Sequence, residues 1–341
     1  MIARTFIIAE VGVNHNGSTR IAKKLIKQLA KLDIDAIKIQ AFTADKLVSA
    51  NSELAKYQSA NTNKFNNQYE MLKEYELSIE EIEELADYAR KIGVTVFSSV
   101  FSLSDYKKIE SLGNNYIKIP SGEFTNYQLI DIALNKYKEV VLSTGLSDMN
   151  EIIEVISWIK KKREGLEGVS ILHCTSAYPC PSEDVDINSI STIANKFNVK
   201  VGFSDHTIGN VASIMAISQG ALIIEKHVTL DKQLEGPDHK ASQDMDEFAM
   251  FTTQIREAEK MLGNGNKEIQ KSAKENFNIV KKSIYALQDI NKGDKFSDKN
   301  LITLRPAGGI DSRYIAVLEG KNSKDEYKKG DLISKKELPS K

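Results

Sequence analysis

The sequence predicts an α/β protein in which a closed (β/α)8 barrel is followed by a small, β-rich C-terminal domain. Eight short β-rich runs occupy the first two thirds of the chain, and amphipathic helical stretches lie between most of them. From Ser283 onward, short strands and turns replace this alternation. The eight β-rich runs are residues 5–12, 35–42, 94–100, 115–122, 139–145, 168–175, 199–206 and 221–228.

The helical stretches are recognised by their apolar period. Residues 20–32, 78–92, 148–162 and 210–220 carry apolar side chains at i, i+3, i+4 and i+7. Alternation of strands and helices indicates parallel strands joined by crossovers, and eight such units in about 230 residues match a closed barrel. The alternative is an open doubly wound sheet. Neither GxGxxG after the first strand nor GxxxxGK is present, so the usual nucleotide signatures do not support that alternative.

The chain divides into three predicted parts. Residues 1–264 form the barrel, residues 265–281 form a polar linker with some helix, and residues 282–341 form a domain too small to have much core. The connection over residues 43–77 is unusually long and rich in Asn, Gln and Tyr. A loop of that length is usually functional or disordered, and its amide and phenol groups suit a polar sugar.

Composition excludes several classes of protein. Lys and Arg number 46 against 47 Asp and Glu in 341 residues, which argues against a general nucleic-acid binder. No apolar run approaches the length of a membrane span, and the N-terminal run meets Glu10 too early for a signal peptide. Cys174 and Cys180 are too few for a disulfide framework and lack metal-ligand spacing. We therefore expect a cytoplasmic protein with two reduced thiols.

Ionisable residues interrupt three of the most strand-like runs. Lys38, Lys118 and Glu225 each stand beside apolar strand residues, although burying an ammonium without a partner is costly. Side chains alternate between the helix-packed outside and the interior of a barrel, and active sites lie at the carboxyl ends of its strands. Because these residues fall near the carboxyl ends of the strands, we expect their side chains to line one polar pocket at that end of the barrel. A lysine on a solvated sheet edge is the ordinary alternative.

Two of the five histidines, His206 and His227, stand at equivalent positions of the seventh and eighth runs. Adjacent strands lie about 4.8 Å apart, so both rings can reach one divalent cation with open coordination positions. Such a site suits Mn²⁺ or a similar ion that polarises a carbonyl. Spacing alone leaves this metal site and ordinary core histidines equally open.

Lys38 and Lys118 would place two cations in the same mouth. They converge comfortably if they share an anion, so a phosphate or carboxylate substrate is the economical explanation. Ser121, Ser143 and Ser204, with neighbouring backbone N–H groups, would complete the cradle of that anion.

These residues belong to longer motifs that together resemble the sialic acid synthase family. The motifs are "IIAEVGVNHNG", "IKIQAF", "IKIPSGE", "LSTG", "HCTSAYPCP", "GFSDHT", "IEKHVTLD" and "GPDHKAS". Residues 282–310 resemble that family's C-terminal antifreeze-like domain, the SAF domain, which has a β-clip fold. The resemblance covers nearly the whole chain in the expected order.

The resemblance implies a TIM barrel that condenses phosphoenolpyruvate with an N-acylated mannose-type sugar, giving a nine-carbon 2-keto acid and phosphate. It also implies a divalent metal, most often Mn²⁺ with Mg²⁺ or Co²⁺ as alternatives, and a domain-swapped homodimer in which each SAF domain covers the partner's site. The expected reaction gives N-acetylneuraminate from N-acetylmannosamine. The alternative gives N,N'-diacetyllegionaminate from 2,4-diacetamido-2,4,6-trideoxymannose. The motif "EGPDHKAS" favours these two branches over the pseudaminate branch.

The resemblance also assigns roles to individual residues, with His206 and His227 as metal ligands and Arg305 delivered to the sugar's acyl group by the SAF domain. The sequence departs from the family pattern at Ser99, where Thr is common, and at Val100, which replaces a proline; Asn63 is the candidate for the family's sugar-contacting Asn in the long loop. The assigned residues are, near the reacting centre, Glu10, Glu225, His206 and His227; for phosphoenolpyruvate, Lys38, Ser99, Lys118, Ser121, Ser143 and Ser204; for the sugar, Gln40, Asn63, Glu123, Tyr178, Asp238 and Arg305.

Two other functions compete with this one. A Schiff-base aldolase would use Lys118 as its nucleophile, but it leaves the two histidines without a role. A carbohydrate-binding protein without catalytic activity would use the SAF domain, but it leaves the two lysines unexplained.

Overall fold

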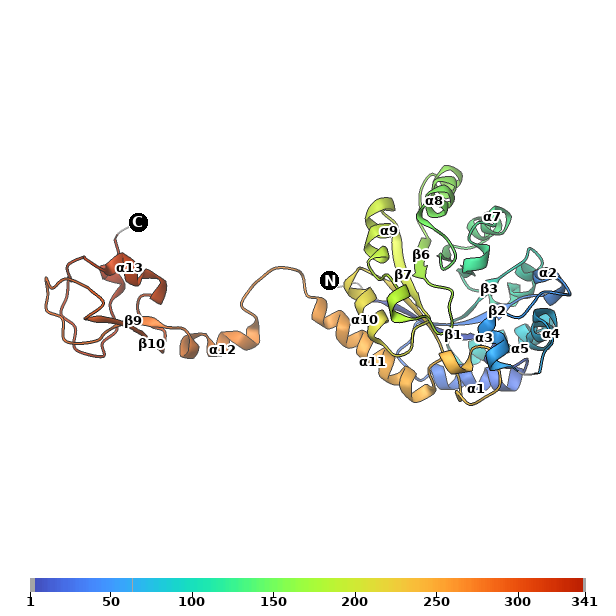
Figure 1. The fold of residues 1–341 in the computed structure, drawn as a ribbon, viewed down its shortest axis with the longest axis horizontal. Helices are drawn as coiled ribbons and strands as arrows, with labels where there is room; N and C mark the ends of the chain where they lie inside the picture. The colour runs from blue at the N-terminus through green and yellow to red at the C-terminus, as the bar shows by residue number, and fades with distance from the viewer. Residues whose placement is uncertain (1–3, 63, 340–341) are drawn as a thin grey trace. The chain divides into compact units, whose positions relative to one another are not determined.

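Eight parallel strands close into a barrel in a computed structural model of the chain, which describes residues 4–62 and 64–339 (Figure 1). Closure joins β1 to both β2 and β8, which confirms the predicted barrel and excludes the open sheet. Every strand lies within one of the predicted runs. The strands are β1 (Phe6–Gly12), β2 (Ala36–Ala41), β3 (Val96–Val100), β4 (Tyr116–Ile119), β5 (Glu139–Ser143), β6 (Val169–Cys174), β7 (Lys200–Asp205) and β8 (Ile223–His227).

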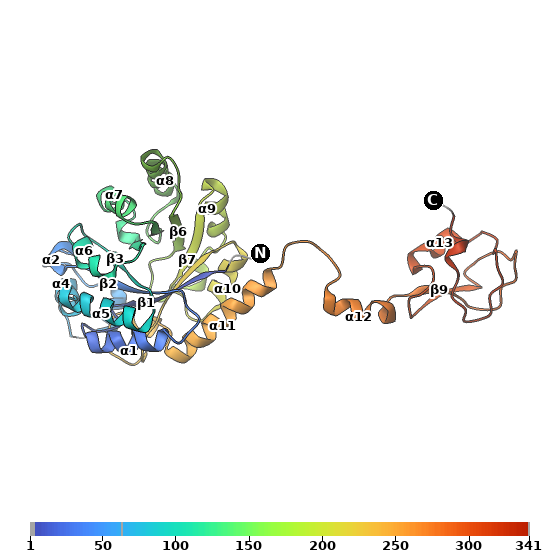
Figure 2. The ribbon, with the colours of Figure 1, turned by 180° about the vertical axis from the view of Figure 1, so that it is seen from behind.

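A ring of helices covers the outside of the barrel, as Figures 1 and 2 show. Helix α5 (Ile79–Ile92) illustrates the local signals, because Ser78 and Glu81 form a capping box at its start and Gly93 ends it in the left-handed conformation. None of the helices in the described ranges is both long and apolar enough to cross a bilayer. The helices that follow the strands are α1 (Thr19–Leu29), α5 (Ile79–Ile92), α6 (Asp105–Lys108), α7 (Tyr127–Lys136), α8 (Met149–Arg163), α9 (Ser189–Phe197), α10 (Val211–Ser218) and α11 (Met245–Leu262).

The side chains inside the barrel change character along the strands. Near the amino ends, the interior is filled by a separate apolar cluster of Ile8, Ala36, Phe97, Val141, Leu172 and Ile223. Two residues further along β1, β2 and β8, the same inward face carries Glu10, Lys38 and Glu225. The bottom of the barrel is therefore a packed core, and its carboxyl end is a buried polar layer.

A segment between β2 and α5 carries three short helices, α2 (Ala44–Leu47), α3 (Lys56–Asn61) and α4 (Gln68–Tyr75), where the sequence predicted a long functional loop. Both ends of this segment are held by one buried ammonium. Lys108 Nζ donates to the backbone carbonyls of Phe42 at 2.8 Å and Leu77 at 3.2 Å, and it pairs with Glu76 at 2.8 Å. The segment thus has a fixed base beside the barrel mouth.

Residues 265–341 form a second compact unit. It contains α12 (Lys271–Val280) in the segment predicted as linker, an antiparallel pair of β9 (Ser283–Ala286) and β10 (Leu301–Leu304), and α13 (Ile315–Leu318). The sequence predicted that this unit would have little core, but it contains an apolar cluster of its own. That cluster comprises Ile284, Ala286, Ile290, Phe296, Leu301, Ile310, Leu318, Tyr327 and Ile333.

Candidate active site

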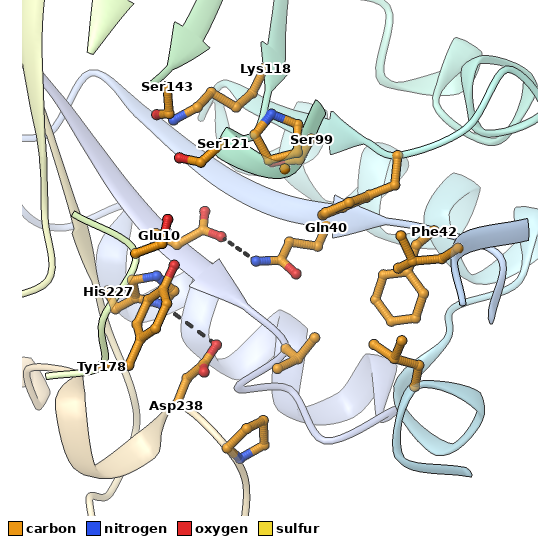
Figure 3. Close-up of a pocket in the computed structure, with 18 of the residues that line it drawn as sticks. Glu10, Gln40, Phe42, Ser99, Lys118, Ser121, Ser143, Tyr178, His227 and Asp238 are labelled. Atoms are coloured by element: carbon orange, nitrogen blue, oxygen red, sulfur yellow. Dashed lines mark hydrogen bonds and ion pairs between the residues drawn. The ribbon is translucent and has the colours of Figure 1, made fainter. Parts of the chain in front are cut away.

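A pocket opens at the carboxyl ends of the barrel strands and is lined by side chains from around the ring (Figure 3). Arg305 lies in the second unit, where its side chain is exposed, and Asn63 lies outside the described residues. The barrel brings together all the other residues that the sequence assigned to a site. These are Glu10, Lys38, Gln40, Ser99, Lys118, Ser121, Glu123, Ser143, Tyr178, Ser204, His206, Glu225, His227 and Asp238.

The two lysines of the pocket are paired with carboxylates of the chain itself. Lys38 Nζ lies 2.7 Å from Glu10 Oε2 and 3.8 Å from Glu225 Oε2, and it donates to Ser99 Oγ at 3.0 Å. Lys118 Nζ donates to both oxygens of Glu225, at 2.8 and 2.9 Å. The two buried ammonium groups therefore do not by themselves require a ligand anion, since Glu10 and Glu225 already pair with them.

The same cluster moves the pKa values of its two carboxyl groups apart. Burial alone would raise the pKa of Glu225, but Lys118 and Lys38 outweigh it and hold that pKa below its ordinary value. For Glu10, burial dominates over the attraction of Lys38, and the charge of Glu225 adds to it, so its pKa is raised. Burial also lowers the pKa of Lys118. Two carboxyl groups in one pocket therefore differ in their hold on a proton, as acid–base partners do.

His206 and His227 face each other across the ends of β7 and β8, with ring centroids 5.5 Å apart. His206 Nδ1 lies 2.7 Å from the Thr175 carbonyl oxygen, which assigns the proton to Nδ1 and leaves Nε2 as an acceptor facing Ser204 Oγ at 3.4 Å. Burial and the neighbouring His206 push the pKa of His227 well below its ordinary value, so its ring is neutral. Cys174 and the Thr175 carbonyl outweigh burial and raise the pKa of His206.

These two rings fit a cation whose other ligands come from water or substrate. His227 Nδ1 is buried and makes no hydrogen bond with any residue that the structure describes, and it lies 3.8 Å from Asp238 Oδ2. Within residues 4–62 and 64–339, no group of three His, Cys, Asp or Glu side chains is arranged to hold a metal ion by itself. A neutral imidazole with a free lone pair is the form in which histidine binds metals.

Aromatic rings form one wall of the pocket beside the histidines. Tyr178 lies 4.2 Å from His206 and 5.1 Å from Tyr57, measured between ring centroids. Burial raises the pKa of Tyr178 well above its ordinary value, so its hydroxyl stays protonated and can donate. Burial and the charge of Glu10 raise the pKa of Asp238 to about 6.

Asp238 is held in place by the first glycine-rich turn of the chain. Asn14 Nδ2 donates to Ser242 Oγ at 2.8 Å, and Ser242 Oγ donates to the Asp238 carbonyl oxygen at 2.7 Å. Asn16 Oδ1 lies 3.0 Å from His239 Nε2. The motifs "VNHNG" and "GPDHKAS" thus form one hydrogen-bonded unit that supports the loop carrying Asp238.

Sequence reasoning missed several residues of this pocket. Tyr57, Gln58 and Gln68 come from the long segment that was expected to be functional, but no pattern within it singled them out. Cys174 is free and buried, with its Sγ 3.7 Å from His206 Nδ1. Although burial opposes it, the proximity of His206 lowers the pKa of Cys174. Its position at the end of a predicted strand was the available signal.

A barrel whose carboxyl-end pocket holds buried lysines, carboxylates and a histidine pair defines a TIM-barrel enzyme acting on polar or anionic substrates. The chain belongs to the NeuB family, whose model matches residues 25–267, and residues 281–339 match the SAF domain. These matches confirm the resemblance seen in the sequence.

Individual relatives are similar over nearly their whole lengths. An N,N'-diacetyllegionaminic acid synthase from Campylobacter jejuni is 40% identical and is matched over 97% of this chain and 99% of its own. Another from Legionella pneumophila is 39% identical over 92% of this chain and 89% of its own. A solved N-acetylneuraminic acid (sialic acid) synthetase from Leptospira borgpetersenii is 30% identical with a TM-score of 0.69, covering 80% of this chain and 90% of its own.

Replacing Glu225 by Gln should destabilise the ligand-free barrel, because Lys118 would keep a buried ammonium without its carboxylate. Breaking a buried pair in this way costs about 3–5 kcal/mol, which a lowered unfolding midpoint in calorimetry would report. The control is Glu84→Gln, whose surface carboxylate pairs with Lys23 and should matter by less than about 1 kcal/mol. Equal midpoints for the two variants would contradict the role given to Glu225.

Proposed function

We propose that this chain is a transferase that condenses phosphoenolpyruvate with an N-acylated mannose-type sugar, forming a nine-carbon 2-keto acid and releasing phosphate. The observation that carries the proposal is the convergence of Lys38, Lys118 and the histidine pair in one pocket of a NeuB-family chain. The names of its relatives support the same chemistry. Because Cys174 and Cys180 are free thiols, we place the reaction in the cytoplasm.

Phosphoenolpyruvate would bind on the side of the pocket where the two lysines lie. Lys38 and Lys118 would hold its anionic groups, with Ser99, Ser121, Ser143 and Ser204 as further contacts. The Ser143 hydroxyl supports this assignment, because it is buried and has no hydrogen-bond partner among the described residues. A ligand oxygen would supply the missing partner.

The chain's carboxyl groups would then manage charge and protons during the reaction. In this reaction, C3 of phosphoenolpyruvate attacks the sugar aldehyde, water adds at C2, and phosphate leaves by C–O cleavage. Glu225, which stays ionised between two lysines, would stabilise positive charge that develops at C2. Glu10, whose pKa is raised, would accept a proton more readily than Glu225 does, or would direct the water.

His206 and His227 would hold a divalent metal, with Mn²⁺ expected first and Mg²⁺ or Co²⁺ as alternatives. When bound, the metal supplies a Lewis acid for the sugar's aldehyde group. Gln40, Glu123, Tyr178 and Asp238 line the same pocket and would orient the sugar's hydroxyl and acylamino groups.

The first candidate for the acceptor is N-acetylmannosamine, which would give N-acetylneuraminate. The second is 2,4-diacetamido-2,4,6-trideoxymannose, which would give N,N'-diacetyllegionaminate. The names of the Campylobacter jejuni and Legionella pneumophila relatives favour this second candidate.

The reaction itself is tested by incubating the purified protein with phosphoenolpyruvate and either sugar. We expect phosphate release that requires a sugar, and a product mass equal to sugar plus phosphoenolpyruvate plus water minus phosphoric acid. A Schiff-base aldolase would instead be trapped on Lys118 by borohydride in the presence of a keto substrate. Sugar binding without any consumption of phosphoenolpyruvate would overturn the proposal in favour of a carbohydrate-binding protein.

The metal site is tested by removing the ion and one ligand separately. Chelator-treated protein should lose activity and recover it with Mn²⁺, because the two rings are the only protein ligands we assign. In His206→Ala, Mn²⁺ binding followed by electron paramagnetic resonance should weaken at least about tenfold, because even the loss of a residue that only supports a metal ligand costs about 10- to 100-fold in affinity. The control is His173→Ala, whose ring is held by the Val185 carbonyl away from the pocket. Full activity of the metal-free protein would contradict the site.

We also propose a domain-swapped homodimer in which Arg305 acts in the partner's pocket. The proposal rests on the family resemblance and on two observations. Arg305 is exposed and makes no hydrogen bond or ion pair with residues that the structure describes. The described residues that line the barrel pocket include no arginine that would meet the sugar's acyl carbonyl.

Complementation tests this sharing of sites between two chains. Lys38→Ala and Arg305→Ala homodimers should each be nearly inactive. Refolding them together should form mixed dimers from about half of the chains, each with one doubly defective site and one intact site by the two-fold symmetry. Activity should therefore return to roughly a quarter of that of the unmodified protein. Mixed dimers that form but stay inactive would show that Arg305 does not act across chains.

A further inference from the structure

The pocket has two ends of different chemistry. Figure 3 shows Glu10, His227, Tyr178 and Asp238 gathered on one side, and Phe42 on the far side of Gln40 from them. Around Phe42 the lining is apolar and aromatic, in contrast to the charged end. We call this apolar end the region lined by Phe42, Leu47, Met71, Leu72, Tyr75 and Phe101.

The apolar end is a packed surface. Phe42 and Phe101 meet edge to face, with ring centroids 6.1 Å apart, just beyond the ends of β2 and β3. Met71 and Tyr75, on α4, are buried in the same cluster with Phe42. Lys108 Nζ donates a hydrogen bond to the Phe42 carbonyl oxygen, and this bond fixes the position of the wall relative to the barrel. These side chains form the core of the segment and, at the same time, a wall of the pocket.

The glutamine side chains beside this wall already hydrogen-bond to their neighbours. Gln58 Oε1 accepts from the Ala55 N–H at 2.9 Å and from Gln68 Nε2 at 3.4 Å, and Gln58 Nε2 donates to the Tyr57 hydroxyl at 3.3 Å. Tyr75 also brings a hydroxyl group to the apolar end, but a ligand hydroxyl pressed against Phe42 and Leu47 would meet carbon atoms. Burying a hydroxyl without a partner is unfavourable, whereas burying a methyl group is favourable.

This inference rests on the proposed function, which puts the sugar's aldehyde carbon beside His206 and His227. In an open-chain hexose, C6 is the end of the molecule furthest from that carbon. We propose that the apolar end receives C6 and selects sugars that carry a methyl group there, with the methyl of a C4 acylamino group as a second apolar contact. The pocket then prefers a 2,4-diacetamido-6-deoxy sugar over N-acetylmannosamine, whose C4 and C6 carry hydroxyl groups.

The size of this preference is bounded by what an apolar pocket achieves. Rejection of a hydroxyl by such a pocket is limited to about 100-fold, so we expect kcat/KM to favour the deoxy sugar by about 10- to 100-fold. The experiment measures phosphate release with each sugar separately and the ratio of the two product masses in competition. Equal use of the two sugars, or preference for N-acetylmannosamine, overturns the inference and leaves the proposed function standing. Consumption of neither sugar overturns both.

Variants at the apolar end link the preference to its residues. Phe42→Ser removes the ring and adds a hydroxyl, so the preference should fall at least about tenfold, whereas the control Phe42→Leu keeps an apolar surface and should retain it. Because Phe42 is buried, Leu47→Asn at a half-exposed position of the same wall is the second variant and should also reduce the preference. The readout is the ratio of kcat/KM values in one preparation, which does not depend on how much protein folds. An unchanged ratio in both polar variants overturns the assignment.

Discussion

The ion pairs of Lys38 with Glu10 and of Lys118 with Glu225 allow the barrel to carry charge in its interior. All four side chains are buried, and isolated ions at such depth would be costly. Each pair joins different strands, β2 with β1 and β4 with β8, so pairing depends on the closed ring. The cluster makes the carboxyl end of the barrel polar, while the layer below it stays apolar.

A third buried ion pair supports the histidines from the outer face of β7 and β8. Asp205 and Lys226 are direct register partners on β7 and β8, and Lys226 Nζ lies 2.8 Å from Asp205 Oδ2. Ser213 donates to the same carboxylate oxygen at 2.6 Å. Each residue of the pair immediately precedes one histidine, His206 or His227. The strand ends that present the two rings are therefore tied together by a bond that faces away from the pocket.

Two different parts of the chain build this pocket. The barrel strands supply the charged residues and the histidines, whose positions follow from register and strand alternation. The segment between β2 and α5 supplies Tyr57, Gln58 and most of the apolar end, to which Phe101 is added from the end of β3. A loop can change without disturbing the strands, so this division allows one reaction to serve different sugars.

Local patterns in the sequence determined the eight barrel strands, four of the helices that cover them, and the lysines and histidines of the pocket, because strand alternation and helical period are properties of neighbouring residues. Lys38, Lys118 and His227 were recognisable as polar residues in otherwise apolar strands. Only the tertiary structure decided their partners. Lys118 and Glu225 are 107 residues apart in the chain, and barrel closure with its register brings them into contact. The apolar end was hidden for the same reason, since it forms only where the segment folds over the strand ends.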